Sequence, residues 1–259
     1  MSPAPARRFT RYVALGDSST EGIDDPDGAG GYRGWSQRLA EQLAGAHPGL
    51  LYANLAIRGL TTAQVRAGQL DAALALRPDL ATVFCGTNDV TAPRFDADRL
   101  AADVESMQRA LVAGGSTVVG FTLPDLTPLM PLARLIAPRI AALNRALAAA
   151  SARTGAILVD FAAYPVATDA RLWSDDRIHA NAAGHARIAA ALARALHLPG
   201  TDDTWCRPLP PPPHRSRLRA VAAEARWWRR HLAPWLWQSL RGRSSADGRR
   251  PKRPALAPP

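Results

Sequence analysis

Short apolar runs that alternate with amphipathic stretches constrain the fold of this 259-residue chain more than any other feature. Each apolar run is rich in Val, Leu, Ala or Phe, as expected for strands buried on both faces of a sheet. The runs cover residues 11–15, 51–56, 80–85, 117–121 and 156–160. Helical spacing of apolar residues fills the intervals, over 35–45, 62–76, 97–113, 132–153 and 183–197. Alternating strands and helices imply right-handed crossovers, so we expect an α/β fold with a five-stranded parallel sheet in a flavodoxin-like order.

The positive charge is concentrated in the last part of the chain. Residues 1–200 hold 19 Arg against 18 Asp and Glu, whereas residues 201–259 hold 13 Lys and Arg against 4 Asp and Glu. Nearly all of the net charge of +10 therefore belongs to the C-terminal stretch. The overall basicity is no argument for nucleic-acid binding by the main domain, and we regard nucleic acid as an unlikely partner.

The composition divides the chain into four segments. Residues 1–200 form one domain, and the run Pro208 to Pro213 marks a linker over 201–213. Apolar residues recur at helical spacing with arginines between them, which predicts an amphipathic Arg/Trp helical segment over 214–241. Residues 242–259 read as a disordered basic tail.

Five of the seven tryptophans lie in 201–259, which is too many for a fully solvated segment. Three interpretations stay open for this segment. It docks on the main domain or self-associates, it lies at a membrane surface, or it binds nucleic acid through arginines and stacking.

The sequence offers no sign of a membrane span, a disulfide framework or a metal site. No apolar stretch is long enough to cross a bilayer, and residues 1–11 lack the apolar core of a signal peptide. Cys85 and Cys206 are the only cysteines, and no Cys/His group has zinc spacing. We therefore expect a cytoplasmic, unprocessed protein without a disulfide framework.

Ser18 follows the first apolar run, in the order Gly16-Asp17-Ser18-Ser19. Open α/β folds keep their reactive groups at the carboxyl ends of strands. A serine hydroxyl needs a base to become a nucleophile, and the neutral imidazole of His179 can accept its proton. Asp176, three residues earlier, can orient that ring by accepting the Nδ1–H. The alternative for Ser18 is a simple helix N-cap.

A nucleophilic serine also needs donors for the oxyanion that forms during acyl transfer. Gly59 follows the run 51–56, and Asn88 follows the run 80–85. We expect the backbone N–H groups of Ser18 and Gly59 and the Asn88 side-chain amide to converge at one edge of the sheet. The alternatives are a glycine required only for a positive φ and an asparagine that forms an Asx-turn.

Other polar residues near these positions have simpler interpretations. Asp17 is expected to organise its loop as a hydrogen-bond acceptor, and Asp175 is the weaker rival of Asp176. Arg33 is expected to be solvated or to pair with an acid in 24–27 rather than to bind an anionic substrate. The remaining histidines are assigned to turns, packing or the tail: His47, His185, His197, His214 and His231.

These blocks resemble those of the SGNH hydrolases, the GDSL-type lipase and esterase family. The matching positions, over roughly residues 10–197, are Gly16-Asp17-Ser18, Gly59, Gly86-Thr87-Asn88-Asp89 and Asp176-x-x-His179. Asn181 and Gly184-His185 resemble the residues that usually follow the catalytic histidine in this family. Ser19 departs from the Gly-Asp-Ser-Leu form at a position that varies in the family. The resemblance implies a three-layer α/β/α domain and a serine ester hydrolase without a metal or cofactor. It implies Ser18, Asp176 and His179 as the catalytic triad and Ser18, Gly59 and Asn88 as the oxyanion hole, and it does not cover 200–259.

The substrate class stays open between several esters that the same machinery would accept. An acetylated sugar, a short-chain ester, a lysophospholipid and an acyl thioester all fit it. Four apolar residues are candidates for an acyl pocket, and burial beneath a loop is the alternative for them: Leu123, Leu126, Leu129 and Met130. A second function class is a scaffold that its basic Trp-rich tail recruits to anionic lipid or to a protein partner.

Overall fold

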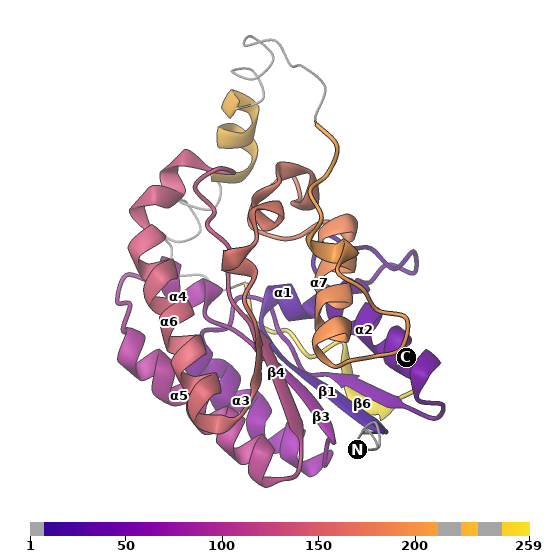
Figure 1. The fold of residues 1–259 in the computed structure, drawn as a ribbon. Coiled ribbons are helices and arrows are strands. Elements are labelled where there is room, and N and C mark those ends of the chain that lie inside the picture. Colours follow the sequence, from indigo (N-terminus) through magenta and orange to yellow (C-terminus); the bar gives the residue numbers. More distant parts are fainter. Residues whose placement is uncertain (1–7, 212–223, 233–244) are drawn as a thin grey trace.

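The computed structural model describes residues 8–211, 224–232 and 245–259, and its centre is a six-stranded sheet (Figure 1). The strands are β1 (Arg11–Gly16), β2 (Leu51–Asn54), β3 (Leu80–Phe84), β4 (Thr117–Phe121), β5 (Ile157–Val159) and β6 (Arg253–Ala257). Their order is β5-β4-β3-β1-β2-β6, and the first five pair in parallel. These five follow the flavodoxin-like order predicted from the sequence.

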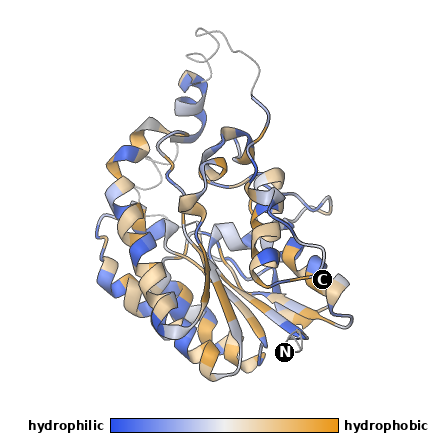
Figure 2. Cartoon of the chain, in the orientation of Figure 1, coloured by the Kyte–Doolittle hydropathy of each residue, from blue (hydrophilic) through white to orange (hydrophobic). Residues whose placement is uncertain are grey.

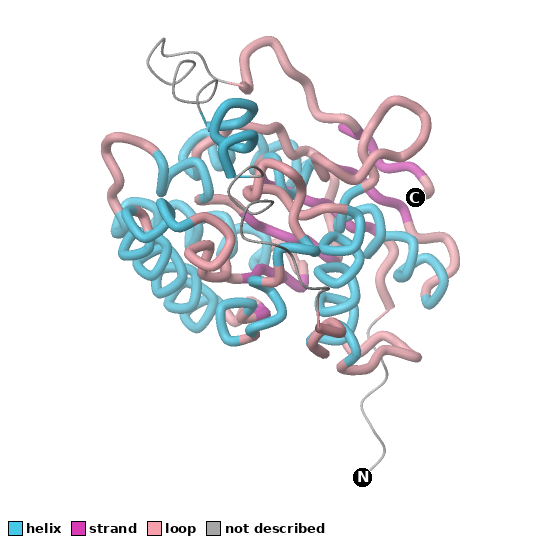
Figure 3. Tube along the Cα trace, turned by 90° about the horizontal axis from the view of Figure 1, so that it is seen from above, coloured by secondary structure: helices cyan, strands magenta, loops and turns pink. Residues whose placement is uncertain are grey.

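Helices cover both faces of the sheet and make the fold a three-layer α/β/α arrangement. They are α1 (Ser18–Glu21), α2 (Gly34–Ala46), α3 (Thr62–Ala75), α4 (Thr87–Thr91), α5 (Ala97–Ala113), α6 (Ala137–Thr154) and α7 (Ala182–Ala195). One layer pairs α2 with α7, and the other packs α5 between α3 and α6. In the view from above, the strands lie between the two helix layers (Figure 3).

Short 3-10 helices lie in the connections after β4, β5 and α7. They are η1 (Pro131–Leu135), η2 (Phe161–Ala163), η3 (Pro165–Thr168), η4 (Ala170–Leu172) and η5 (Thr204–Cys206). The predicted helix 132–153 is divided into η1 and α6. Pro138 stands in the first turn of α6, where a missing backbone N–H is tolerated, so the helix begins anew there.

The core is built on the central strands. Every residue of β3 is buried, as expected for a strand covered on both faces. Hydrophobic residues, orange in Figure 2, are concentrated along the strands, and hydrophilic residues, in blue, lie mainly in the helices and loops. An aromatic cluster closes the carboxyl end of the sheet, with the rings of Phe84 and Phe121 stacked 3.8 Å apart and Trp35 packed edge-on to Phe121.

The expectation of five strands and of disorder over 242–259 is wrong for the described residues 245–259. Strand β6 pairs antiparallel with β2, placing Ala257 opposite Tyr52 and Arg253 opposite Asn54. The edge of β2 offers unpaired backbone groups, and a basic, proline-containing strand that lacks a core of its own can pair with that edge. Leu256 packs against the core, and the Arg253 guanidinium lies 5.5 Å from the Tyr52 ring centroid.

The other C-terminal residues that the structure describes also pack on the domain. Trp205 of η5 is buried against Phe161 and Tyr164, so this part of the predicted linker 201–213 packs on the core. Residues 224–232 are helical and include a π-helical turn, Trp228–Leu232, while the rest of the predicted segment 214–241 lies outside the described residues. Trp227 is buried against the domain. Of the three interpretations of the tail, this contact agrees with docking on the main domain. In the described ranges, no helix has the length and apolar character to cross a bilayer.

Candidate active site

Ser18 stands at the point where β1 turns sharply into α1. A Cβ on Gly16 would collide with the Phe84 carbonyl oxygen and with Thr20, so only glycine fits the close approach of β1 to its neighbour. Asp17 caps α1 by accepting a hydrogen bond from the Ser19 N–H at 3.1 Å. Ser18, the first helical residue, is 8% exposed and faces the imidazole of His179.

A continuous hydrogen-bond chain joins the three residues predicted as a triad. The Ser18 Oγ lies 2.9 Å from His179 Nε2, and His179 Nδ1 lies 2.6 Å from Asp176 Oδ2. The Nδ1–H therefore donates to the carboxylate, which leaves Nε2 as the acceptor for the serine hydroxyl. The carboxylate at this distance is that of Asp176, as the three-residue spacing predicts.

The loop that carries Asp176 holds the carboxylate in place from several sides. Asp176 Oδ1 accepts the backbone N–H groups of Ile178 and His179 at 2.9 and 3.0 Å and the Ser174 hydroxyl at 2.6 Å. The Ser174 N–H donates to the His179 carbonyl at 2.8 Å and closes the loop. Arg177, at the centre of this turn, has a φ of +63°.

The electrostatics of the pair favour a charged carboxylate and a basic imidazole. Burial lowers the pKa of His179, but the hydrogen bond and negative charge of Asp176 outweigh burial and raise it above 6.5. Burial raises the pKa of Asp176, but the hydrogen bond and charge of His179 outweigh burial and hold it well below 3.8. The arrangement suits a histidine that takes up a proton during the reaction.

Asn88, one of the two oxyanion donors expected besides Ser18, contacts the neighbours of both other donors. Gly59 has a φ of +81°, and Asn88 is the second residue of α4. The Asn88 Nδ2 donates to the Leu60 carbonyl at 3.0 Å and to Asp17 Oδ2 at 3.3 Å. The structure thus joins the segments around Ser18, Gly59 and Asn88, although both Asn88 contacts are made to protein groups.

Asp17 is a buried acid that sequence analysis assigned only to loop organisation. Its exposed fraction is 0%, and burial raises its pKa to about 7 against the lowering effect of the Ser19 N–H. Its contact with Asn88 connects the loops after β1 and β3. The acceptor role was predicted, whereas the contact with Asn88 needs the relative placement of two loops and has no signal in the sequence.

A pocket opens beside Ser18 and His179, with about 750 Å³ of empty space when its open mouth is counted. Aromatic and aliphatic side chains line most of it, among them Phe84, Phe121, Leu123, Phe161, Val166 and Trp205. Only one of the four predicted pocket residues, Leu123, lies on this wall. Leu126, Leu129 and Met130 are buried in the core instead. Phe84 and Phe121 are the last residues of β3 and β4, so the strand-end rule that pointed to Ser18 could have found them.

Two other residues weighed as functional candidates, His185 and Arg33, have structural roles. His185 is 1% exposed, its Nδ1 accepts the Trp35 N–H, its Nε2–H donates to the Ile23 carbonyl, and burial lowers its pKa to about 4. Arg33, the N-cap residue of α2, pairs with Glu41 of that helix rather than with an acid in 24–27.

Asp24 is a further acid near the hydrogen-bonded pair of Asp176 and His179, and its Oδ2 lies 4.0 Å from His179 Nδ1. Atoms of Asp24, Asp176 and His179 that could bind a metal ion lie within 4.8 Å of one another. His179 Nδ1 already donates to Asp176, so we assign these three side chains to the hydrogen-bonded pair and its surroundings rather than to a metal site.

Comparisons with known proteins identify the family and the fold. Residues 14–187 match the model of the GDSL-like Lipase/Acylhydrolase family. Among solved structures, the psychrotrophic esterase EstA from Pseudoalteromonas sp. is 18% identical with a TM-score of 0.58, covering 73% of this chain and 97% of its own. Axe2, an acetylxylan esterase from Geobacillus stearothermophilus, is 19% identical with a TM-score of 0.59, covering 76% and 96%. TesA is 25% identical with a TM-score of 0.59, covering 72% and 98%.

Among curated proteins, none matches the chain. The family model alone spans well over half of the 259 residues and includes Ser18, Gly59, Asn88, Asp176 and His179. This chain therefore belongs to the GDSL-like lipase and acylhydrolase family, and is a serine ester hydrolase of the SGNH type.

Proposed function

We propose that the protein hydrolyses carboxylic esters through an acyl-enzyme formed on Ser18. The observation that carries the proposal is the hydrogen-bond chain from Asp176 through His179 to the Ser18 hydroxyl, at the mouth of an apolar pocket. Each step uses a protein group or water, so the mechanism requires neither a metal nor a cofactor.

In the first half of the reaction, the Ser18 Oγ attacks the ester carbonyl carbon while His179 Nε2 takes the hydroxyl proton. The tetrahedral intermediate collapses, the bond to the alcohol oxygen breaks, and His179 returns the proton to the departing alcohol. In the second half, His179 removes a proton from water, which attacks the acyl carbon. The carboxylic acid then leaves, and Ser18 regains its proton.

The oxyanion of each intermediate is stabilised by donors from three loops. We assign the backbone N–H groups of Ser18 and Gly59 and the Asn88 side-chain amide to this role. The 3.3 Å contact between Asn88 Nδ2 and Asp17 is the longer of its two, and the substrate oxyanion would replace it. The 3.0 Å bond to the Leu60 carbonyl would keep the amide oriented.

The pocket beside Ser18 is the proposed acyl site. Its lining is mainly apolar, as the linings of most small-molecule sites are. We therefore favour esters with an acyl chain longer than acetyl over acetylated sugars. The alcohol side of the substrate, and the choice between an ester and a thioester, stay open.

Ser18→Ala tests the nucleophile. We expect kcat for p-nitrophenyl esters to fall by about 10³-fold or more, because the substituted residue can no longer form the acyl-enzyme. A fluorophosphonate probe should label the parent enzyme and not the variant. Parental activity in the purified variant would rule out the mechanism. A chain-length series from acetyl to palmitoyl esters then measures the acyl preference.

Contact with a membrane surface, self-association through the tail and a cytoplasmic location stay predictions. The exposed arginines Arg226, Arg229 and Arg230 on the segment 224–232 support attraction to anionic lipid. Co-sedimentation of the full chain with anionic and with neutral vesicles tests the lipid contact. Gel filtration at several concentrations tests self-association.

A further inference from the structure

The C-terminal helical segment 224–232 lies directly on the turn that carries Asp176. Trp227 of this segment is 5% exposed, and its indole Nε1–H donates to the Asp176 backbone carbonyl at 3.3 Å. The segment falls outside residues 14–187, the part of the chain that the family model matches. An element added after that part therefore contacts the backbone of the proposed catalytic acid.

The turn beneath Trp227 contains a residue in an unfavourable backbone conformation. Arg177 has a φ of +63°, a region that L-residues other than glycine rarely occupy. This conformation reverses the chain between Asp176 and His179. The reversal lets one carboxylate accept both the Ile178 and His179 backbone N–H groups and the His179 Nδ1–H.

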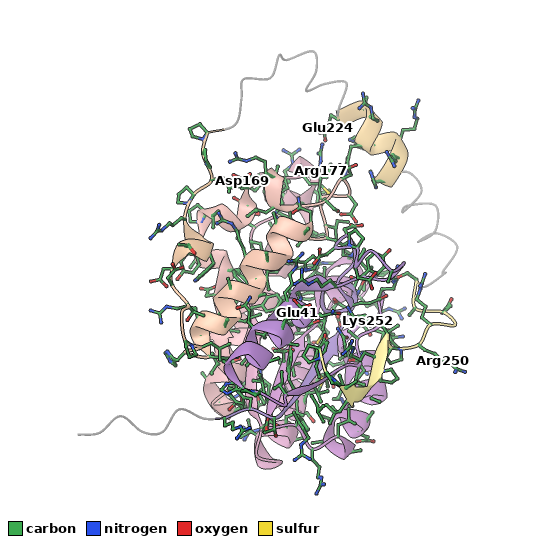
Figure 4. All side chains as sticks on the ribbon, turned by 90° about the vertical axis from the view of Figure 1, so that its right-hand side faces the viewer. Glu41, Asp169, Arg177, Glu224, Arg250 and Lys252 are labelled. Atoms are coloured by element: carbon green, nitrogen blue, oxygen red, sulfur yellow. The ribbon has the colours of Figure 1, made fainter. Side chains whose placement is uncertain are left out.

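The Arg177 side chain is held by two partners that lie far away in the sequence. Its guanidinium pairs with Glu224 at 2.8 Å and donates to the Leu129 carbonyl at 3.2 Å. It also lies 4.6 Å from the Trp227 ring centroid, in a cation–π contact. Figure 4 shows Arg177 on the domain directly below Glu224 on the C-terminal helix. The contacts of Arg177 and the Trp227 hydrogen bond therefore hold the same turn.

We propose that Trp227, supported by Glu224, is a positioning residue that holds the Asp176 turn in the shape needed to orient His179. The inference rests on the proposed function in that it assigns a task to the Asp176–His179 pair. Trp227 touches no reacting atom in this scheme, because it acts through the Asp176 carbonyl and through Arg177.

Substitutions at Trp227 separate its two contacts. Trp227→Phe removes the N–H donor and keeps a ring over Arg177, whereas Trp227→Ala removes both contacts. For Trp227→Ala we expect kcat to fall about 10- to 100-fold with KM nearly unchanged, the scale associated with misplaced catalytic groups. Trp227→Phe should retain more activity. The matched control is Trp228→Ala, because Trp228 is the neighbouring tryptophan and is 46% exposed, and it should behave as the parent.

Arg177→Gly tests whether the contacts act through the turn. Glycine adopts a positive φ without strain, so it should hold the turn without help from the C-terminal segment. In the Arg177→Gly background, Trp227→Phe should therefore cost less activity than in the parent. An undiminished cost in this double variant would overturn the role of the turn.

The pH profile distinguishes positioning from a purely structural role. His179 faces Asp176 and Asp24, and Asp17 and His185 also influence it electrostatically. Loosening the bond to Asp176 removes the main influence that raises the His179 pKa. The acidic limb of kcat/KM for Trp227→Ala should then move to lower pH. A fall in Tm with the limb unmoved would mean that Trp227 only stabilises the fold, and would overturn the proposal.

Proton NMR provides a readout that needs no substrate. The His179 Nδ1–H bonded to Asp176 should give a strongly downfield resonance in the parent and in Trp228→Ala, and a shifted or lost one in folded Trp227→Ala. This result supports positioning even if no ester is hydrolysed, in which case only the proposed function fails. An unchanged resonance together with a parental pH profile would overturn the positioning role and leave ester hydrolysis intact.

Discussion

At the residue scale, Asp17 couples the stability of the protein to pH. Burial raises its pKa to about 7, so the folded state keeps a proton that the unfolded chain loses near pH 4. Between these values the unfolded state binds fewer protons, and the free energy of unfolding decreases as the pH rises. The loss is complete above about pH 7. It amounts to something on the order of 4 kcal/mol, because each unit of pKa shift corresponds to about 1.4 kcal/mol.

Asp17→Asn should remove this dependence. We expect the variant to lose less stability than the parent between pH 5 and pH 8, measured as the free energy of unfolding in urea. Asp71→Asn is a suitable control because it removes an exposed carboxylate from α3. Identical pH dependence in the parent and in Asp17→Asn would show that Asp17 remains charged in the folded protein.

At the element scale, the 3-10 helices that connect β5 to α7 form one side of the pocket wall. Val166 of η3 lies on this wall and is 8% exposed. Val166→Phe should fill part of the acyl site. We expect kcat/KM to fall about tenfold for octanoyl and longer p-nitrophenyl esters and to change little for acetyl esters, because overpacking affects only chains that reach the wall. An equal loss for all chain lengths would place the acyl group elsewhere. Leu135→Phe, on the exposed side of η1, is the control.

The sequence predicted the regular elements of the domain better than the pocket that they support. The five apolar runs are strands because residues such as Val83 and Phe84 are buried on both faces of the sheet, which leaves a continuous apolar signal. The site residues at strand ends were predicted by the same rule. The pocket-lining residues of η2 and η3 belong to no recognisable sequence pattern, because a 3-10 helix of three or four residues is too short to show a period.

At the scale of the whole molecule, β6 and the segment 224–232 join the C-terminal stretch to the domain. Neither contact could be predicted from composition. The pairing of Arg253 with Asn54 and the bond from Trp227 to Asp176 depend on partners at least 50 residues away. A basic, proline-rich sequence reads as disordered when such distant partners are not considered.

Removing residues 253–259 tests the contribution of β6. We expect Tm to fall by roughly 5 °C, because the variant loses the backbone pairing with β2 and the packing of Leu256. The exposed β2 edge should also make the variant aggregate more readily, which light scattering would detect. A variant that lacks only Pro259 should melt as the full chain does. An unchanged Tm after removal of residues 253–259 would mean that β6 adds nothing to stability.

The position of β6 also has a consequence for biosynthesis. About 200 residues separate β2 from the strand that completes its hydrogen bonding. A nascent chain exposes the open side of β2 until residues 253–257 have emerged from the ribosome, and pairing over so long a separation is slow. Chaperone demand should therefore persist until β6 has been synthesised, because the parallel part of the sheet has formed by then and its outer margin is still unprotected.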